Sequence, residues 1–557
     1  MGGAALVAVV ALFAAVPGTA LGAADPADQP PFGGEPVPRL QAPESRDSPP
    51  SGFTLSAREA IAIADRTEGV RSERELNPLT ITAATRGDDR WEVRYRDPDG
   101  VQQALVVIDD PSEQVVEAWT GNQVDTKLAR GYEDAVSGDV NEAWLWLPLC
   151  VLFIAPFIDP RRPFRLIHLD LLALLGFSVS LFFFNKGNLG LSVPLVYPVL
   201  AYVFVRMLIA GMRPTESRDR LLPWARPAWL VIGIVALVLF RVGYEVAEGK
   251  VIDVGLAGVI GADRLADGDD LYGVEFAQGL PSRGDVRGDV YGPVNYLAYV
   301  PAEQAFPYDG EWGEVPAARA AALAFDLLAA LALFALGGRL REGEEGRTLG
   351  IALAFAWLAY PFSMYTLGSS FNDSLVALSV IACLLTVSSA PARGAVAALS
   401  GLTKFGSLAL APVLAAGTGD RRPRTVAVFA IAFLATAALV TAPLLPDGGP
   451  RELYDRSLGY QASRGSPFSI WSLEPSLEPL QTASKAFAAL FAAVLFFVPR
   501  RRSPIQIAAL AAAALIAVQV TATHWFYPYA VWFAPLVLVA VFAAQRGPER
   551  PVSRAPA

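Results

Sequence analysis

Long apolar runs separated by short arginine-rich segments fill most of the chain between residues 143 and 544. An α-helix needs ~20 mostly apolar residues to cross the ~30 Å hydrocarbon core of a bilayer. Hydrophobic residues make up 53% of the chain and charged residues only 18%, a balance that water-soluble globular proteins rarely reach. The pattern predicts an all-α polytopic membrane protein with about eleven transmembrane helices. The expected spans are residues 143–158, 166–184, 191–211, 228–244, 317–336, 348–366, 372–388, 425–442, 482–498, 503–521 and 526–544.

The arginines between these spans predict how the protein is oriented. Cytoplasmic loops of membrane proteins carry an excess of Lys and Arg. With the N-terminus outside, every predicted inside loop is basic, so we expect a multi-pass protein of the plasma membrane. The long loops 245–316 and 443–480 are then extracytoplasmic. The inside loops carry Arg161, Arg162 and Arg165; Arg213, Arg218, Arg220 and Arg226; Arg339, Arg341 and Arg347; Arg500, Arg501 and Arg502; and Arg546, Arg550 and Arg554.

The apolar stretch 394–416 breaks this alternation because basic residues flank both of its ends. Arg393 precedes it, and a cluster of arginines around Pro423 follows it. A straight span would place one of these basic ends outside. Small and polar residues around Lys404 interrupt its middle, so we expect two half-helices that form a re-entrant hairpin with both ends inside.

Two segments at the N-terminus are expected to lie outside any folded core. Residues 1–23 resemble a secretory signal peptide, although they lack a basic start, and an uncleaved anchor is the alternative. Residues 24–52 are rich in proline and predict an extended linker.

Residues 53–131 predict a small α+β extracytoplasmic domain. Ser56 and Glu59 have the spacing of a capping box for a helix at 57–66. Alternating apolar and polar residues then predict strands. One helix followed by such a meander resembles a PepSY domain, and a generic extracytoplasmic α+β module is the alternative. The expected strands are residues 79–84, 90–96, 101–108 and 115–119.

Cysteine, histidine and net charge exclude several classes of function. Cys150 and Cys383 both fall in predicted spans, which argues against a disulfide framework or a zinc site. The two histidines, His168 and His524, are too few for a histidine metal cluster, so a divalent ion would need carboxylates. We expect no cofactor. The net charge of -9 and the lack of a basic stripe exclude a nucleic-acid partner.

Motifs at the outer ends of the spans carry a family resemblance. The loop 245–316 has an early Asp253, then a Gly-Ala-x-x-Leu-x-x-Gly-x-x-x-Tyr-Gly motif over 261–273, then Tyr-Gly-Pro-x-x-Tyr over 291–296. Together they resemble the GT-C superfamily of membrane glycosyltransferases, most of all the glycosyltransferase 87, polyprenol-phosphate-mannose-dependent type. Further matching motifs are Tyr360-Pro361, Asn372-Asp373, Lys404-Phe405, Arg464-x-Ser466-Pro467-Phe468-Ser469 and His524-Trp525-Phe526-Tyr527.

The resemblance covers residues 228–544 and leaves three accessory helices, residues 143–211, outside the core. It implies a polyprenyl-phosphate-linked sugar donor, with mannose the family's common sugar, and a glycan or glycolipid acceptor outside the membrane. Such a reaction needs a carboxylate that takes the acceptor proton and cations that stabilise the departing phosphate. Asp253 suits the base, because the apolar stretch 251–261 partly desolvates it, and Lys404 and Arg464 suit the phosphate clamp.

The matched motifs also make Tyr291, Asn295, Asp373, His524 and Tyr527 candidates for binding substrate. Several of the candidate residues have a structural alternative. Asp253 also fits the N-cap of a helix, and Arg464 fits an ordinary surface arginine. Lys404 fits a side chain that pairs with backbone carbonyls at the hairpin tip. His524 and Tyr527 fit an aromatic belt. Four acids fit a solvated face: Asp263, Asp267, Asp269 and Asp270.

Two other functions remain open for the whole chain. A transporter or lipid-glycan flippase would be expected to have an internal repeat and ionisable residues along a central path. The sequence contains no such repeat, and its polar motifs concentrate on one face of the membrane. A membrane scaffold or sensor would leave the polar and aromatic motifs of residues 245–316 without a role.

Overall fold

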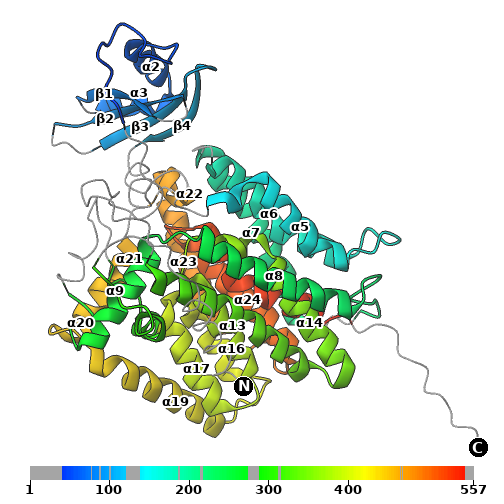
Figure 1. Ribbon diagram of the computed structural model, residues 1–557. Coiled ribbons are helices and arrows are strands. Elements are labelled where there is room, and N and C mark those ends of the chain that lie inside the picture. Colours follow the sequence, from blue (N-terminus) through cyan, green and yellow to red (C-terminus); the bar gives the residue numbers. More distant parts are fainter. Residues whose placement is uncertain are drawn as a thin grey trace, which may run out of the picture.

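The computed structural model describes residues 40–76, 78–86, 89–98, 102–120, 138–185, 189–213, 217–273, 288–310, 315–463, 466 and 468–545. A small sheet domain lies at one end of a large helical bundle (Figure 1). The expected signal peptide and most of the expected linker fall outside the described residues.

The N-terminal domain contains an antiparallel sheet with the strand order β1-β2-β3-β4. Its strands are Thr80–Arg86, Arg90–Arg96, Gln102–Asp109 and Gln114–Thr120. The predicted meander is therefore confirmed. The alternating Trp91, Val93 and Tyr95 of β2 are fully buried because they share the face that the helices cover.

In the described residues, two helices precede this sheet, whereas the sequence predicted one for this domain. Helix α2, Ala57–Ala64, begins with the predicted capping box of Ser56 and Glu59. Helix α3, Glu68–Leu76, was not predicted because its residues are mostly charged. Packing against the sheet stabilises α3, since Gly69 of this helix lies directly against Thr120 of β4. The likeness to a PepSY domain stays a prediction.

Helices of the bundle coincide with all of the predicted spans. Six of them, α6, α7, α8, α13, α19 and α24, are long and apolar enough to cross a membrane. The protein is thus a multi-pass membrane protein, and the number of eleven spans stays a prediction. The helices are α5 Ala143–Ile154, α6 Leu166–Asn185, α7 Leu189–Met212, α8 Pro227–Ala247, α13 Pro316–Leu340, α14 Gly343–Ala359, α15 Pro361–Leu367, α16 Asp373–Leu385, α17 Ala390–Thr403, α18 Ala411–Ala416, α19 Pro423–Thr441, α23 Glu478–Val494, α24 Pro504–Thr521 and α25 Ala530–Phe542.

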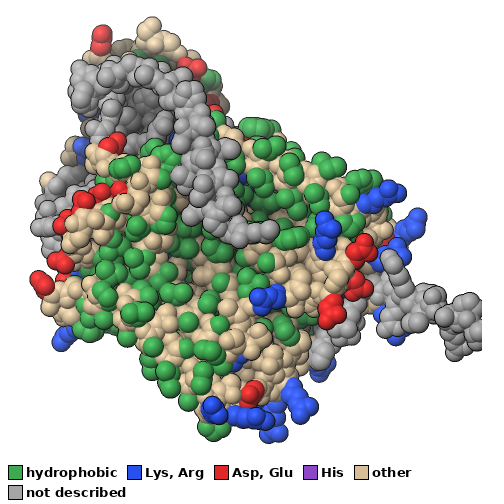
Figure 2. Space-filling model, turned by 60° about the horizontal axis from the view of Figure 1, so that its bottom comes forward, with side chains coloured by type: hydrophobic (Ala, Val, Ile, Leu, Met, Phe, Trp, Pro, Cys, Tyr) green, Lys and Arg blue, Asp and Glu red, His purple; other side chains and the backbone are tan. Residues whose placement is uncertain are grey.

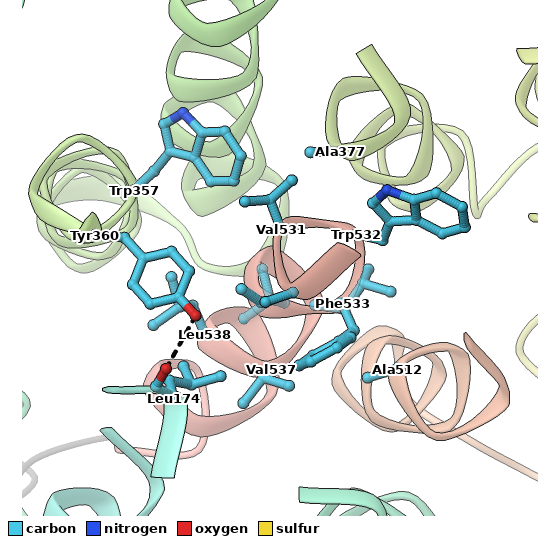
Figure 3. Packing of buried hydrophobic residues seen from close by; sticks show 14 of the residues in the cluster. Leu174, Trp357, Tyr360, Ala377, Ala512, Val531, Trp532, Phe533, Val537 and Leu538 are labelled. Carbon is cyan, nitrogen blue, oxygen red and sulfur yellow. Dashed lines mark hydrogen bonds between the residues drawn. The ribbon is translucent and has the colours of Figure 1, made fainter. Parts of the chain in front are cut away.

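Helix α25 lies at the centre of the bundle. Figure 3 shows Val531, Phe533 and Val537 of this helix packed among side chains from several other helices. Helix α19, in contrast, lies at the outside of the bundle. Phe429 is the only buried residue of this helix, and Leu439 is 77% exposed. Figure 2 shows hydrophobic side chains spread over the face in view, with Lys and Arg gathered toward its lower and right-hand edges. This distribution suits a bilayer around the bundle.

The predicted span 348–366 is divided between two helices, because α14 and α15 meet at an angle of 59°. Pro361 has no N–H and cannot continue the helix. The carbonyl groups released by the break find side-chain donors. Leu358 O accepts from the Arg241 guanidinium at 2.8 Å, and Trp357 O accepts from the Ser363 hydroxyl at 2.6 Å. The bend is therefore a hydrogen-bonded part of the fold.

The chain reverses at Lys404, as the two half-helices of the sequence prediction require. Helix α17 ends at Thr403, Lys404 is extended, and a 3₁₀ turn at Phe405–Leu410 leads into α18. Arg393 Nε, near the start of α17, donates to Leu414 O in α18 at 2.9 Å. The two ends of this segment therefore lie side by side, and its re-entry into the membrane stays a prediction.

Candidate functional site

The long loop after α8 brings two helix N-termini together. Lys250 N–H donates to Gly368 O at 3.0 Å, and Ser370 Oγ donates to Lys250 O at 2.9 Å. The segment before α9, Asp253–Asp267, therefore lies against the segment before α16. Asp253 and Asp373 are each the first residue of their helices, where the helix dipole favours negative charge.

Asp253 is half-buried at the start of α9. Ile252 is the N-cap residue and Asp253 follows it, so the N-cap alternative for Asp253 is wrong. The Asp253 carboxylate interacts electrostatically with the Lys404 ammonium. The structure thus places the proposed base near Lys404, one of the two residues that the sequence assigned to the phosphate clamp.

Lys404 is buried in a polar and aromatic cage. Its Nζ lies 2.8 Å from Asp373 Oδ1, and the Trp532 indole N–H donates to the same oxygen at 2.6 Å. The ring centroids of Tyr291, Tyr529 and Trp532 lie 5.2, 5.5 and 5.4 Å from Nζ, which are cation–π distances. The partner of Lys404 is therefore a carboxylate, and the alternative of backbone carbonyls at the hairpin tip is wrong.

Two fully buried asparagines lie beside this cage. Asn372 Nδ2 donates to Asn295 Oδ1 at 2.8 Å. Within the part of the chain that the structure describes, Asn295 Nδ2, Asn372 Oδ1 and the Tyr299 hydroxyl have no hydrogen-bond partner. A buried polar group without a partner costs about 1–3 kcal/mol. These three atoms therefore suit hydrogen bonds to a bound polar molecule or to water.

Tyr291 reaches Lys404 because Gly292 allows the loop to approach the hairpin. A Cβ at Gly292 would lie 1.9 Å from the carbonyl oxygen of Leu402. Tyr291 is also fixed on its other side, since its carbonyl accepts from the Tyr272 hydroxyl at 3.0 Å and its N–H donates to Tyr296 OH at 3.2 Å. The Tyr-Gly-Pro motif thus sets one wall of the cage.

The two long loops, residues 245–316 and 443–480, contact each other through a buried ion pair. Asp289 of the first loop is fully buried and lies 2.9 Å from Arg456 Nη1 of the second. Arg456 also pairs with Glu452 at 2.7 Å. Burial lowers the pKa of Arg456, but the hydrogen bond to Glu452 and the charge of Asp289 outweigh burial and raise it. The pair holds the loops together and compensates the charge of Asp289.

The acids at the end of α9 agree with a solvated face, with one exception. Asp267, Asp269 and Asp270 are exposed. Asp263 is half-buried, and its pKa is raised by burial and by the nearby charges of Asp267 and Glu303.

Two further candidates, His524 and Tyr527, lie just before α25. His524 Nδ1 is 2.7 Å from Ser466 Oγ, and its ring lies 6.0 Å from the Tyr529 ring of the cage. Tyr527 is buried against α6 and α7, where its hydroxyl lies 2.7 Å from Ser180 Oγ and 2.8 Å from Ser192 Oγ. An aromatic belt at the membrane interface needs rings on the surface, so the buried Tyr527 does not fit this alternative. Arg464 falls outside the described residues.

Sequence reasoning missed Trp532, Tyr529 and Tyr299 at this site. Both Trp532 and Tyr529 fall in an expected span, where aromatic residues are usual and carry no specific signal. For a metal ion, no group of three or more His, Cys, Asp or Glu side chains occurs among the described residues.

The fold and site define a multi-pass helical membrane protein with a buried, charged and aromatic cluster at one end of its helices. Residues 290–469 match the family model of glycosyltransferase family 87, which supports a glycosyltransferase. Tyr291, Asn295, Asp373 and Lys404 lie inside the matched segment, and Asp253 lies before it. No curated protein and no solved structure matches the chain.

Proposed function

We propose that this protein transfers a sugar from a polyprenyl-phosphate donor to a glycan or glycolipid acceptor at the extracytoplasmic face of the plasma membrane. The observation that carries the proposal is the cluster of Asp253, Asp373 and Lys404, which joins carboxylates to a cation. Asp373 and Lys404 lie inside the segment matched by family 87. Mannose, the sugar that the family resemblance implies, is the first donor to test.

Asp253 is the proposed general base. It accepts the proton of the acceptor hydroxyl while the acceptor oxygen bonds to the anomeric carbon. Asp373 suits this role less well, because both Lys404 and Trp532 donate to one of its oxygens and stabilise its charged form. Asp289 is held by Arg456 in the same way. The half-buried position of Asp253 leaves it within reach of an acceptor.

Lys404 and Arg464 are the proposed clamp for the donor phosphate. As the bond between the anomeric carbon and the phosphate oxygen breaks, the phosphate keeps the electron pair and gains charge. A lysine ammonium has three donors, and Asp373 takes one of those of Lys404. Asp373 therefore orients Lys404 without using all of its hydrogen-bonding capacity.

The sugar is proposed to bind between the asparagine pair and Tyr291. Asn295 and Asn372 offer amide groups to sugar hydroxyls, and their free atoms in the described part of the chain support this role. His524 and Tyr527, which lie just before the last helix, are proposed to line the rest of this substrate site.

A transfer assay with the purified full-length protein tests the proposal. We expect polyprenyl-phosphate mannose, or another polyprenyl-phosphate sugar, to yield a glycosylated acceptor and free polyprenyl phosphate. Nucleotide sugars should yield none. Movement of the lipid-linked sugar across a proteoliposome without a new glycosidic bond would instead identify a flippase and overturn the proposal.

A further inference from the structure

A basic cavity lies at the opposite end of the bundle from the Lys404 cluster, where the accessory helices meet the end of α25. It has a volume of about 530 Å³ and is formed by the loop between α5 and α6, the end of α7, the loop before α8 and the end of α25. Four arginines and one aspartate line it: Arg161, Arg162, Arg165, Arg206 and Asp219. This end belongs to the side that the arginine pattern predicts to be cytoplasmic.

The arginines of this cavity exceed the carboxylates that neutralise them. Asp219 pairs with Arg162 and with Arg165, whose Nε lies 3.3 Å away. Arg206 lies 3.0 Å from Asp170, which is buried and does not line the cavity. Arg161 makes no side-chain hydrogen bond or ion pair with a described residue. The lining therefore keeps a net positive charge.

The loop that carries these arginines is held in one conformation. His168 Nε2 accepts from Asp159 N–H at 3.0 Å, and its Nδ1 lies 2.8 Å from Pro163 O. Arg165 is 6% exposed and donates to Gln545 Oε1 at 3.0 Å. The loop backbone and the Arg165 side chain are therefore fixed, so less conformational entropy is lost when the neighbouring arginines bind an anion.

Apolar side chains continue from the cavity along the outside of the bundle. Phe164 at its rim is 99% exposed and Leu166 is 60% exposed. Leu169 and Leu172 of α6 and Ile209 of α7 extend this exposed surface toward the middle of the bilayer. A ligand that fills the cavity with an anionic group can therefore place hydrocarbon chains on the same surface.

We propose that this cavity binds the phosphate headgroup of an anionic glycerophospholipid, with Arg161, Arg162 and Arg206 around the phosphate and the acyl chains along Phe164 and α6. Arginine side chains suit phosphate because their planar donors pair with two oxygens at once. A free phosphate would use the arginines and leave the apolar surface without a role, so a lipid is the ligand that fits both. The site is independent of the proposed glycosyl transfer.

Lipid binding to the purified full-length protein in detergent tests this proposal. We expect phosphatidylglycerol to remain bound in native mass spectrometry and to raise the melting temperature. The double variant Arg161→Gln/Arg162→Gln should bind it at least about tenfold more weakly, because each charge-assisted hydrogen bond contributes about one order of magnitude. The matched control is Arg500→Gln/Arg501→Gln, which removes two exposed arginines from another predicted inside loop and should bind normally.

Three outcomes would overturn the proposal. Binding of phosphatidylcholine as tight as that of phosphatidylglycerol would remove the role of net charge. An equal loss of affinity in the control variant and the cavity variant would make the effect non-specific. Stabilisation by inorganic phosphate alone that equals stabilisation by the lipid would identify a free anion as the ligand.

Discussion

Asp253 and Asp373 each begin a helix at the same end of the bundle, yet their surroundings differ. Asp373 is buried and shares one oxygen between Lys404 and Trp532, whereas Asp253 is half-buried at the start of α9. A carboxylate whose charge is already stabilised by two donors accepts a further proton poorly. This difference supports separate roles, with Asp253 as base and Asp373 as the residue that positions Lys404.

Replacing Asp253 with asparagine tests the base. Asp253→Asn keeps the size of the side chain and removes the proton acceptor, so turnover should fall by about 10²–10⁴-fold while donor binding changes little. Asp267→Asn, an exposed acid on the same helix, is the control and should remain active. Normal turnover of Asp253→Asn together with an inactive Asp373→Asn or Asp289→Asn would assign the base to another carboxylate.

Lys404 provides the second test at this scale. Lys404→Ala removes the proposed phosphate ligand, so donor binding should weaken by ~1–3 kcal/mol, the range for hydrogen bonds to charged groups. Titration of a non-hydrolysable donor analogue measures this change. Lys485→Ala, on the exposed side of α23, is the control. Unchanged donor affinity in Lys404→Ala would leave Lys404 with the structural role of pairing Asp373.

Among the elements, the turn at Gly292 links the first long loop to the hairpin. An added methyl group would meet the Leu402 carbonyl oxygen at 1.9 Å, and this backbone atom cannot move aside easily. Gly292→Ala should displace Tyr291 from Lys404, and a shift of ~1 Å is enough to reduce turnover by about 10²-fold. Gly273→Ala is a matched control in the preceding Tyr-Gly pair, because its methyl group would meet nothing within 4 Å. Equal turnover of the two variants would contradict the argument.

Asp110 of the N-terminal sheet domain should make the stability of this domain depend on pH. Asp110 accepts from Thr54 N–H at 2.6 Å, from Leu55 N–H at 2.9 Å and from the Trp91 indole at 3.1 Å. Burial raises the pKa of this carboxyl, but the hydrogen bonds outweigh burial and lower it. A lowered pKa stabilises the fold above the unfolded pKa of ~3.9, and this stability is lost as the pH falls through the folded pKa.

We therefore expect β2 and β3 to lose protection from hydrogen exchange below about pH 4, after correction for intrinsic rates. Asp110→Asn should remove this part of the pH dependence and reduce stability at neutral pH by about 1–3 kcal/mol. An unchanged pH profile in the variant would assign the dependence to other groups.

Periodicity and caps predicted most of these elements, and contacts between distant residues decided the rest. The strands and the capping box at Ser56 followed from local patterns. The bend at Pro361 did not, because a proline can also be accommodated within a span, and the Arg241 side chain that binds the released carbonyl lies far away in sequence.

The candidate site shows the same limit. Motif order indicated Asp253, Asp373 and Lys404, but the sequence gives no sign that Lys404 pairs with Asp373 or that Trp532 completes the cage. Those contacts join the loop, the hairpin and the last helix. They depend on how the whole bundle packs, and spacing along the chain does not encode them locally.

At the scale of the whole molecule, the two long loops meet the Lys404 cluster at one end and the basic cavity lies at the other. Trp119 of β4 and Phe184 of α6 have ring centroids 6.2 Å apart, so the N-terminal domain contacts the bundle at the C-terminal end of α6. The cavity lies at the start of α6, close to Leu166. A helix of this length separates the two surfaces by about the thickness of a membrane.

This arrangement predicts which side of the membrane each surface faces. In a background with Cys150 and Cys383 replaced by alanine, single cysteines at Ser112, Ala305 and Glu344 place one exposed probe on the N-terminal domain, one on the first long loop and one at the start of α14. An impermeant maleimide added to intact cells should label Ser112→Cys and Ala305→Cys, because both belong to the end that carries the Lys404 cluster. Glu344→Cys should be labelled only after the cells are opened, since it lies beside Arg341 and Arg347 on a loop predicted to be inside. Labelling of all three in intact cells, or of Glu344→Cys alone, would contradict the orientation, and with it the proposal that sugar transfer takes place outside.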